Sequence, residues 1–387
     1  MIVGVVTTSF PRFEGDPAGG FVEGLSRWVG RHHDIEVVCA REDRRLFYRG
    51  GAPEALFHGP WHGRGWLGAA AFSSRLAVEV ALRARRWDRI MSHWMVPCGV
   101  VAAVAARRLP HLCIAHGSDA RMLAGSASGR RLAGWLAQRS ELVYVAETLR
   151  VDGAPGRVAP MGVDRARLIG TPDRQNDRQN DRQDDRQDDR RSSRRRFGLS
   201  DDDLVVVWLG RLTEGKGPDL LCDALQPEIP GVVALIAGEG PFLPALQRRQ
   251  DRSLRLVGQV SGAAKQALLR SADVLVVSSR VDGAPVVIAE AQACGIPVVA
   301  SAVGGIPELV CHGVEGLLVP VGDREALRSA IVRLRESPSL LAELARGSAV
   351  RGRERDWDVA APRILGSWLE LPEPSTLDAH VFEVRRV

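Results

Sequence analysis

The fold is indicated by one stretch in the second half of the chain, LVVVWLGRLTEGKGP, which occupies residues 204–218. Six consecutive apolar residues are typical of a strand that is buried on both faces. The glycine-rich segment 210–217 then permits a tight turn, and Pro218 suits the first turn of a helix. The stretch therefore predicts a strand, a loop and a helix in a parallel sheet.

Similar apolar runs recur along the chain and mark where we expect strands. They cover residues 2–7, 35–39, 89–92, 111–115, 142–145, 232–237, 254–257, 273–277, 297–300 and 316–319. Segments with helical spacing lie between them, as with Phe21, Leu25 and Trp28. This alternation predicts two Rossmann-like, doubly wound parallel-sheet domains of the α/β class. Ligands of such sheets bind at the carboxyl ends of the strands.

The length of 387 residues predicts two domains, which we expect at 1–165 and 201–356. Between them, 166–200 contains the repeat DRQN or DRQD, followed by an arginine cluster. Because 173–196 holds no apolar residue, we expect a disordered, repeat-expanded linker. A helix laced with opposite charges is the less favoured structure, and a contact of the arginines with an anionic surface or nucleic acid is the less favoured function.

The end of the chain is expected to hold a helix and a loose tail. Residues 357–369 have helical spacing that is interrupted by Pro362, which should kink the helix. Residues 371–387 contain two further prolines and are expected to be loosely held.

Composition indicates a soluble protein of a reducing compartment, which we expect to be cytoplasmic. Hydrophobic residues make up 45% of the chain and charged residues 26%, and no apolar run approaches the ~20 residues that span a bilayer. The six cysteines form no C-x-x-C pair, which argues against a disulfide framework or a zinc site. The net charge of +5 is compatible with anionic ligands, whereas nucleic acid is not expected, since no basic stripe is interleaved with aromatic residues.

Two carboxylates stand out in the segment DGAPVVIAE, residues 282–290. Asp282 follows an expected strand, and Glu290 lies on a helix beside apolar neighbours. A carboxylate in apolar surroundings needs a hydrogen-bond partner, and ligand hydroxyls are suitable partners because an ionised carboxylate accepts from two of them. A glutamate that merely favours a helix N-terminal region, or that bonds to nearby amides, is an equally good explanation of Glu290 taken alone.

Two cations lie in the loop that opens the next helix after residues 204–209. Arg211 and Lys216 are flanked by glycines that let the backbone approach a ligand, and a helix N-terminus favours an anion. The arrangement is that of a diphosphate site, although the order of a Walker A loop is absent. The structural alternative is a glycine turn with two solvated cations.

Two weaker signals lie in the first half of the chain. Gly19 and Gly20 end a loop after the first strand, where a phosphate or acceptor group could approach the following helix. His116 follows the strand at 111–115, at the edge where ligands bind such sheets. A satisfied buried histidine is an equally good explanation, and for His93 and Trp94 packing is the preferred one.

Taken in order, these segments resemble the family-4 glycosyltransferases of the GT-B fold, over nearly the whole chain. The resemblance also draws on further motifs, namely PMGVD at 160–164, GEGP at 238–241, SAVGGIPELV at 301–310 and GLLVP at 316–320. It implies two domains that face a central cleft, a helix at 357–370 that crosses back onto the first domain, and retaining transfer of a sugar from a nucleoside-diphosphate donor to an acceptor hydroxyl.

The resemblance also implies roles for the residues that match the family's motifs. Arg211 and Lys216 would neutralise the donor diphosphate in place of a metal, so that neither a metal nor a cofactor is expected. Glu290 would bind the ribose hydroxyls. Asp282, with the amides of Gly283, Ala284 and Pro285, would contact the donor sugar, and His116 would lie near the reacting carbon. Gly19 and Gly20 would border the donor site.

One residue departs from the family, which usually has glutamate where this chain has Asp282. The charge is kept, but its reach falls by roughly one carbon–carbon bond, about 1.5 Å. A donor sugar with a different hydroxyl pattern, or closure by the loop, would follow from this. UDP and GDP sugars are both compatible with the sequence.

The acceptor is expected to be a carbohydrate or a lipid-linked molecule in polysaccharide or glycolipid synthesis. Arginines of the first domain, at 41, 44, 45, 83, 85 and 86, could meet anionic lipid at the inner membrane face. Two alternatives keep the fold but change the function: a nucleotide-sugar epimerase or phosphorolytic enzyme, and a non-catalytic protein that binds nucleotide-sugars.

Overall fold

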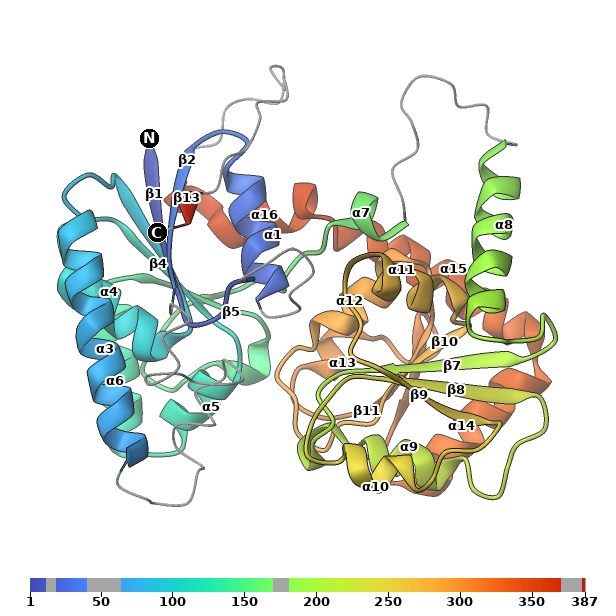
Figure 1. Cartoon of the computed structure of the whole chain (residues 1–387). Helices are drawn as coiled ribbons and strands as arrows, with labels where there is room; N and C mark the ends of the chain where they lie inside the picture. Colours follow the sequence, from blue (N-terminus) through green and yellow to red (C-terminus); the bar gives the residue numbers. More distant parts are fainter. Residues whose placement is uncertain (12–18, 40–63, 170–180, 370–384, 387) are drawn as a thin grey trace. The chain divides into compact units, whose positions relative to one another are not determined.

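The computed structural model describes residues 1–11, 19–39, 64–169, 181–369 and 385–386. Its contacts divide the chain into two compact units, each built around one parallel sheet (Figure 1). Unit 1 comprises Met1–Gly162 with Ala360–Val387, and unit 2 comprises Val163–Val359. The expected domains at 1–165 and 201–356 lie close to this division, but unit 2 also takes in much of the segment that we expected to be a linker.

The sheet of unit 1 has the strand order β13-β2-β1-β3-β4-β5-β6, and every strand pairing is parallel. Its strands are β1 Ile2–Thr7, β2 Asp34–Cys39, β3 Arg89–His93, β4 His111–Ala115, β5 Glu141–Tyr144, β6 Arg157–Val158 and β13 Arg385–Arg386. Its helices are α1 Gly20–Val29, α3 Arg64–Arg83, α4 Val100–Ala105, α5 Ser118–Ala124 and α6 Ala127–Ala137. The chain leaves β1 toward β2 on one side and returns to β3 on the other, so the strand order reverses between β1 and β3.

The sheet of unit 2 has the order β12-β11-β10-β7-β8-β9, again with parallel pairings. Its strands are β7 Leu204–Leu209, β8 Val232–Ala237, β9 Leu254–Gly258, β10 Val274–Val277, β11 Val298–Ser301 and β12 Gly316–Val319. Its helices are α7 Arg165–Ile169, α8 Asp181–Arg196, α9 Pro218–Ala224, α10 Leu243–Gln247, α11 Gly262–Ser271, α12 Val286–Ala293, α13 Ile306–Leu309, α14 Arg324–Glu336 and α15 Pro338–Glu354. Here the order reverses between β7 and β10.

The predicted α/β class is confirmed, and the reason is visible in β7. Val206 and Trp208 enter the hydrophobic cluster on one face of the sheet, while Val205 and Val207 enter the cluster on the other. A strand covered by helices on both faces has no solvent-facing side, so its sequence reads as an uninterrupted apolar run.

The expectation of disorder for 166–200 was wrong for most of the described part of that segment, because 181–196 forms helix α8. Arg190 and Arg194 pair with Asp273 next to β10, and the side chain of Arg194 is only 4% exposed. Arg194 also donates to three carbonyl oxygens in the turn after the helix, those of Ser200, Asp201 and Asp203. Tertiary anchoring of this kind outweighs a weak intrinsic helix propensity.

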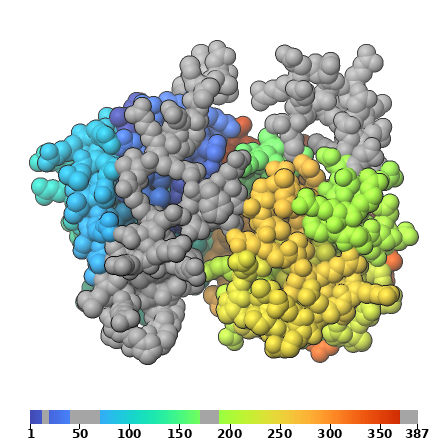
Figure 2. Space-filling model, viewed as in Figure 1, coloured from blue at the N-terminus to red at the C-terminus, as the bar shows by residue number. Residues whose placement is uncertain are grey.

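Helix α8 packs against α11, and Figure 2 shows the two at the surface, α8 in light green beside the yellow-orange of α11. Residues 170–180 of the expected linker lie outside the described residues.

The end of the chain returns to unit 1. Helix α16, Trp357–Leu365, contains Pro362, and unit 1 resumes at Ala360. The guanidinium of Arg157 donates to the carbonyl oxygen of Leu365 at 2.9 Å. The expected loose tail was wrong for 385–386, whose backbone pairs with β2 as strand β13; 370–384 and 387 lie outside the described residues.

Candidate functional site

The point where the strand order of unit 2 reverses brings together the loops that follow β7 and β10. Gly217 has φ 62°, and a Cβ atom there would lie 2.1 Å from the carbonyl oxygen of Ser278. The hydroxyl of Ser278 donates to the carbonyl oxygen of Gly217 at 2.6 Å. The amide of Arg280 donates to the carbonyl oxygen of Gly215 at 2.8 Å. Only glycine fits a left-handed conformation with so close a backbone approach, so the two loops are locked to one another.

The loops after β8 and β11 join the same edge. The amide of Leu212 donates to the carbonyl oxygen of Glu239 at 2.8 Å. The amide of Gly305 donates to the carbonyl oxygen of Gly283 at 2.7 Å. A Cβ atom at Gly304 would lie 1.8 Å from the carbonyl oxygen of Asp282. Four of the six carboxyl ends are therefore held by backbone contacts, which makes this edge a rigid support for side chains.

Lys216 and Asp282, predicted separately, are brought together at this edge. The ammonium of Lys216 lies 2.6 Å from Oδ2 of Asp282. The same oxygen accepts from the hydroxyl of Ser279 at 3.0 Å, while Oδ1 accepts from the amide of Gly283 at 2.9 Å. The Asp282 side chain is 7% exposed and that of Lys216 is 26% exposed. A buried carboxylate is thus fully paired, beside a cation that solvent still reaches.

Arg211 lies on the same loop as Lys216 but is not drawn into this cluster. It is exposed, and within the described residues its side chain makes no hydrogen bond or ion pair with Lys216, Asp282 or Glu290. The structure thus brings together Lys216 and Asp282 of the predicted site and leaves Arg211 as a neighbouring surface cation.

Glu290 has a partner that the sequence analysis missed. It lies in the second turn of α12, and its Oε1 is 2.5 Å from the ammonium of Lys265 on α11. The two helices immediately precede and follow β10 and pack into one hydrophobic cluster, which explains their proximity. A signal was available in the composition: Lys216 and Lys265 are the only two lysines in the whole chain.

In unit 1, Gly19 and Gly20 lie where the first strand's loop meets α1. Gly19 precedes the helix with φ 69°, and a Cβ atom there would lie 2.3 Å from the carbonyl oxygen of Ser9. A Cβ at Gly20 would meet no atom within 4 Å. Gly20 therefore borders open space at the helix N-terminus, while 12–18 of this loop lie outside the described residues.

His116 lies at the carboxyl end of β4, in a cluster of rings. Its Nε2 is 2.9 Å from Nδ1 of His93, and the two imidazoles stack with centroids 5.1 Å apart. Phe21 and Trp94 pack on the same ring at 4.8 and 5.0 Å. The expectation that His93 and Trp94 serve only in packing missed this contact, because they reach His116 from the neighbouring strand β3 and not through adjacent sequence.

Burial keeps this histidine pair neutral. It lowers the pKa of His93 to about 3. Burial, with a further electrostatic contribution from the neighbouring His93, lowers the pKa of His116 well below its usual value. The loops around the pair are tied by buried Asp119, which accepts from the amides of Met95 at 2.6 Å and Gly117 at 3.0 Å. Between them Trp94 adopts φ 71°, a strained conformation for a bulky residue that is found most often at functional sites.

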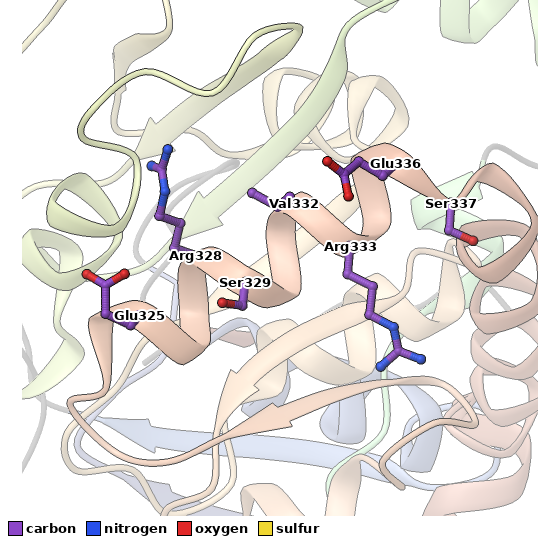
Figure 3. A pocket seen from close by; sticks show the side chains of 7 residues that line it. All are labelled: Glu325, Arg328, Ser329, Val332, Arg333, Glu336 and Ser337. Atoms are coloured by element: carbon purple, nitrogen blue, oxygen red, sulfur yellow. The ribbon is translucent and has the colours of Figure 1, made fainter.

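A surface pocket of unit 2 lies elsewhere, along α14 (Figure 3). None of its lining residues comes from the loops after β7 or β10, and one of them, Arg328, already donates to the carbonyl oxygens of Ala224 and Pro227. We assign it no role in the site. Within the described ranges, no helix is both long and apolar enough to cross a bilayer, and no three metal-binding side chains gather in one place.

Comparison with known proteins gives relatives for part of the chain. A family model described as "Glycosyl transferases group 1" matches residues 203–337. A D-inositol 3-phosphate glycosyltransferase of Mycolicibacterium smegmatis is 35% identical over 187 residues, which cover 44% of this chain and 41% of that protein. A putative teichuronic acid biosynthesis glycosyltransferase of Bacillus subtilis is 28% identical over 255 residues, covering 64% and 61%. The matches thus span less than two thirds of the length of these curated relatives.

Solved structures extend the likeness to both units. Anabaena HepE in complex with UDP-glucose matches with a TM-score of 0.68 at 21% identity, over 95% of this chain and 99% of that one. Sucrose-phosphate synthase of Thermosynechococcus elongatus matches with a TM-score of 0.73 at 19% identity, over 95% and 98%. The chain therefore has the GT-B fold, and residues 203–337 of its second unit match the model of the glycosyl transferases group 1.

Proposed function

We propose that this chain is a glycosyltransferase that moves a sugar from a nucleoside-diphosphate donor to an acceptor hydroxyl. The observation that carries the proposal is the pair of Lys216 and Asp282 where the strand order of unit 2 reverses. Sheets of this kind bind ligands at that point. A cation there can hold a diphosphate, and a carboxylate beside it can accept from sugar hydroxyls.

The roles of the residues follow from their chemistry. Lys216, with Arg211 on the same loop, would neutralise the diphosphate and the charge that grows on it as the glycosidic bond breaks. Asp282 and the amides of Gly283 to Pro285 would bind the donor sugar. Glu290 would bind the ribose hydroxyls, and His116 of unit 1 would lie near the reacting carbon of the donor sugar. The mechanism that fits these residues is retaining transfer in which the leaving phosphate oxygen takes the acceptor proton.

A metal-independent reaction is part of the proposal. Two side-chain cations and a helix N-terminus supply positive charge to the diphosphate, which is the electrostatic contribution that a divalent ion makes in other transferases. Transfer should therefore persist in the presence of EDTA.

UDP-sugars are the first donors to test, since a solved relative of this fold binds UDP-glucose. A carbohydrate or lipid-linked acceptor in polysaccharide or glycolipid synthesis is consistent with the name of the Bacillus subtilis relative, a putative teichuronic acid biosynthesis glycosyltransferase. We further propose that the protein is cytoplasmic and contacts the inner membrane face through unit 1. Arg85 and Arg86 follow α3, on which Val78 and Leu82 are more than half exposed; the arginines at 41–45 lie outside the described residues.

The decisive experiment is a thermal-shift screen of the full chain against UDP-, GDP- and ADP-sugars, followed by an assay of the ligand that stabilises it. We expect slow hydrolysis of that donor with EDTA present, and transfer once an acceptor is supplied. Conversion of the donor into an isomer with no acceptor would indicate an epimerase. Tight binding without turnover across an acceptor panel would indicate a binding protein.

A further inference from the structure

The segments after β7 and β10 share a second ion pair that the proposed function does not use. The guanidinium of Arg280, two residues before Asp282, donates to both carboxylate oxygens of Asp219, at 2.9 and 2.7 Å. Asp219 lies in the first turn of α9, directly after the loop that carries Lys216. Since Lys216 in turn reaches Asp282, each segment sends one cation to a carboxylate of the other.

Arg280 also contacts the turn that carries Lys216. Residues Glu214–Lys216 form one turn of 3-10 helix, and Nη1 of Arg280 donates to the carbonyl oxygen of Glu214 at 2.9 Å. The amides of Arg280 and Val281 both donate to the carbonyl oxygen of Gly215, at 2.8 and 3.1 Å. Two consecutive residues of the turn are thus held by the loop after β10, and the third residue carries the ammonium.

The guanidinium of Arg280 is committed to these contacts within the protein. A two-point contact with a carboxylate fixes the plane of a guanidinium as well as its position. Burial alone would raise the pKa of Asp219, but the hydrogen bonds and charge of Arg280 bring that pKa below its usual value, so the pair is ionised at neutral pH. The two side chains are 33% and 25% exposed, so we expect a small contribution to overall stability and a local effect on the turn.

The cation of Lys216 depends on such support. A lysine ammonium is a compact charge on a flexible stem, without the fixed plane of a guanidinium. When the backbone turn moves, the ammonium moves with it, and a misplacement of about 1 Å in a site can cost about a hundredfold in rate. Holding the turn therefore fixes where the charge of Lys216 is presented.

We propose that Arg280 is a positioning residue of the nucleoside-diphosphate site. Through Asp219 and the carbonyl oxygen of Glu214 it holds the turn that presents Lys216 to the diphosphate, and it does not bind the nucleotide itself. The proposal rests on the proposed function, since it takes Lys216 as a cation of the diphosphate site. The hold of Arg280 on Lys216 can also be measured without a nucleotide.

The first measurement follows the lysines of the full chain by NMR. Lysine labelled with ¹³C at Cε marks only Lys216 and Lys265, and the two signals are assigned by replacing each lysine with methionine. Arg280→Met should move the Lys216 signal toward that of a free lysine side chain and leave the Lys265 signal in place. Arg249→Met is the matched control, since it breaks the ion pair with Asp223 one turn further along α9, and it should move neither signal. An unmoved Lys216 signal in Arg280→Met would overturn the positioning role.

The second measurement is calorimetric titration of the full chain with UDP and with GDP. Arg280→Met should weaken binding about fivefold, but by less than about twofold in a chain that already carries Lys216→Met, since a positioning residue acts only through the group that it positions. Asp219→Asn tests the same role with the guanidinium left in place. It frees Arg280 and removes a negative charge near the diphosphate, so a direct contact of Arg280 with the nucleotide predicts unchanged or tighter binding, whereas the positioning role predicts weaker binding.

Three results would decide against the proposal or its basis. Unchanged or tighter nucleotide binding by Asp219→Asn would overturn the positioning role, and so would an undiminished effect of Arg280→Met in the Lys216→Met chain. If the wild-type chain binds neither UDP nor GDP, the proposed function is refuted and the role of Arg280 at a nucleotide site with it. The lysine signals would still show separately whether Arg280 holds Lys216.

Discussion

The two sheets of this protein share one layout but carry different chemistry at the points where their strand order reverses. In unit 2 that edge holds two ion pairs, formed by Lys216 with Asp282 and by Lys265 with Glu290. In unit 1 that edge holds a cluster of rings, among which His93 and His116 are joined by a hydrogen bond, beside the buried carboxylate of Asp119. The comparison teaches that the fold supplies the place and the loops supply the chemistry: charged loops suit a diphosphate, and rings suit the face of a sugar.

The largest expected effect removes the cation of the unit 2 edge. Lys216→Met should lower the rate of donor turnover about a hundred- to a thousandfold, because an oriented charge at a developing phosphate anion is lost. Steady-state kinetics with the donor found by thermal shift measure it. Arg249→Met is the control, since it breaks another ion pair of unit 2, with Asp223, outside the loops of the site. Similar losses in both variants would mean that general weakening of unit 2 explains the result.

The next effect concerns the backbone that supports those charges. Gly217→Ala should destabilise unit 2 by about 2 kcal/mol or more, because φ is positive and the new Cβ would collide with the carbonyl oxygen of Ser278. Urea unfolding followed by tryptophan fluorescence measures the free energy. Gly215→Ala, on the same loop, meets no atom within 4 Å and should change stability by less than about 0.5 kcal/mol. If Gly217→Ala leaves the free energy of unfolding unchanged, the loop after β7 is free to move away from Ser278.

A smaller effect tests whether the rings of unit 1 belong to the site. His93→Leu should lower donor turnover about tenfold, because the imidazole of His116 loses the hydrogen bond that orients it. His111→Leu removes another buried histidine of the same sheet, which bonds to the hydroxyl of Ser92 at 2.8 Å, and should leave turnover within about twofold of wild type. If both substitutions slow turnover by the same factor, the rings around His116 stabilise the core of unit 1 and take no part in the reaction.

The smallest effect is a difference in acid sensitivity. Burial lowers the pKa of His111, like that of His93, to about 3, whereas the unfolded chain takes up these protons near pH 6.5. The unfolded state therefore binds more protons below pH 6.5, and stability is lost as pH falls from 6.5 toward 3. Each histidine contributes at most about 1.4 kcal/mol per pH unit.

Urea titrations at pH 7, 6 and 5 measure this slope. His111→Leu and His93→Leu should each flatten it, because each removes one buried imidazole whose pKa is lowered. Buried Asp119, whose pKa is raised by burial, acts with the opposite sign, so the comparison between variants is more informative than the slope of the wild type. An unchanged slope in His111→Leu would contradict the assignment of a neutral buried imidazole.

Much of the fold was predictable because parallel strands covered on both faces must be apolar. The runs at 2–7, 111–115, 204–209, 232–237 and 316–319 match the observed strands in both bounds. Helix α8 was not predictable, because its stability comes from Asp273, some eighty residues away in sequence, and not from its own propensity.

The candidate site was predictable in part for a similar reason. Glycines next to Arg211, Lys216 and Asp282 reveal loops in which the backbone turns sharply, and such loops can be read from sequence. The partners of Glu290 and His116 cannot, because Lys265 and His93 approach them across neighbouring elements. Only the scarcity of lysine pointed to Lys265, and its meaning became clear once its carboxylate partner was known.

The anchoring of α8 at its carboxyl end has a consequence for how this gene segment can vary. The four complete copies of the repeat, 173–188, precede Arg190 in sequence, while the contacts with Asp273 come from Arg190 and Arg194. Gain or loss of one four-residue copy changes only the chain upstream of these arginines, so the number of copies can drift between strains without disturbing the sheet of unit 2. A copy-number polymorphism would then alter the length of the connection and leave the charged edge untouched.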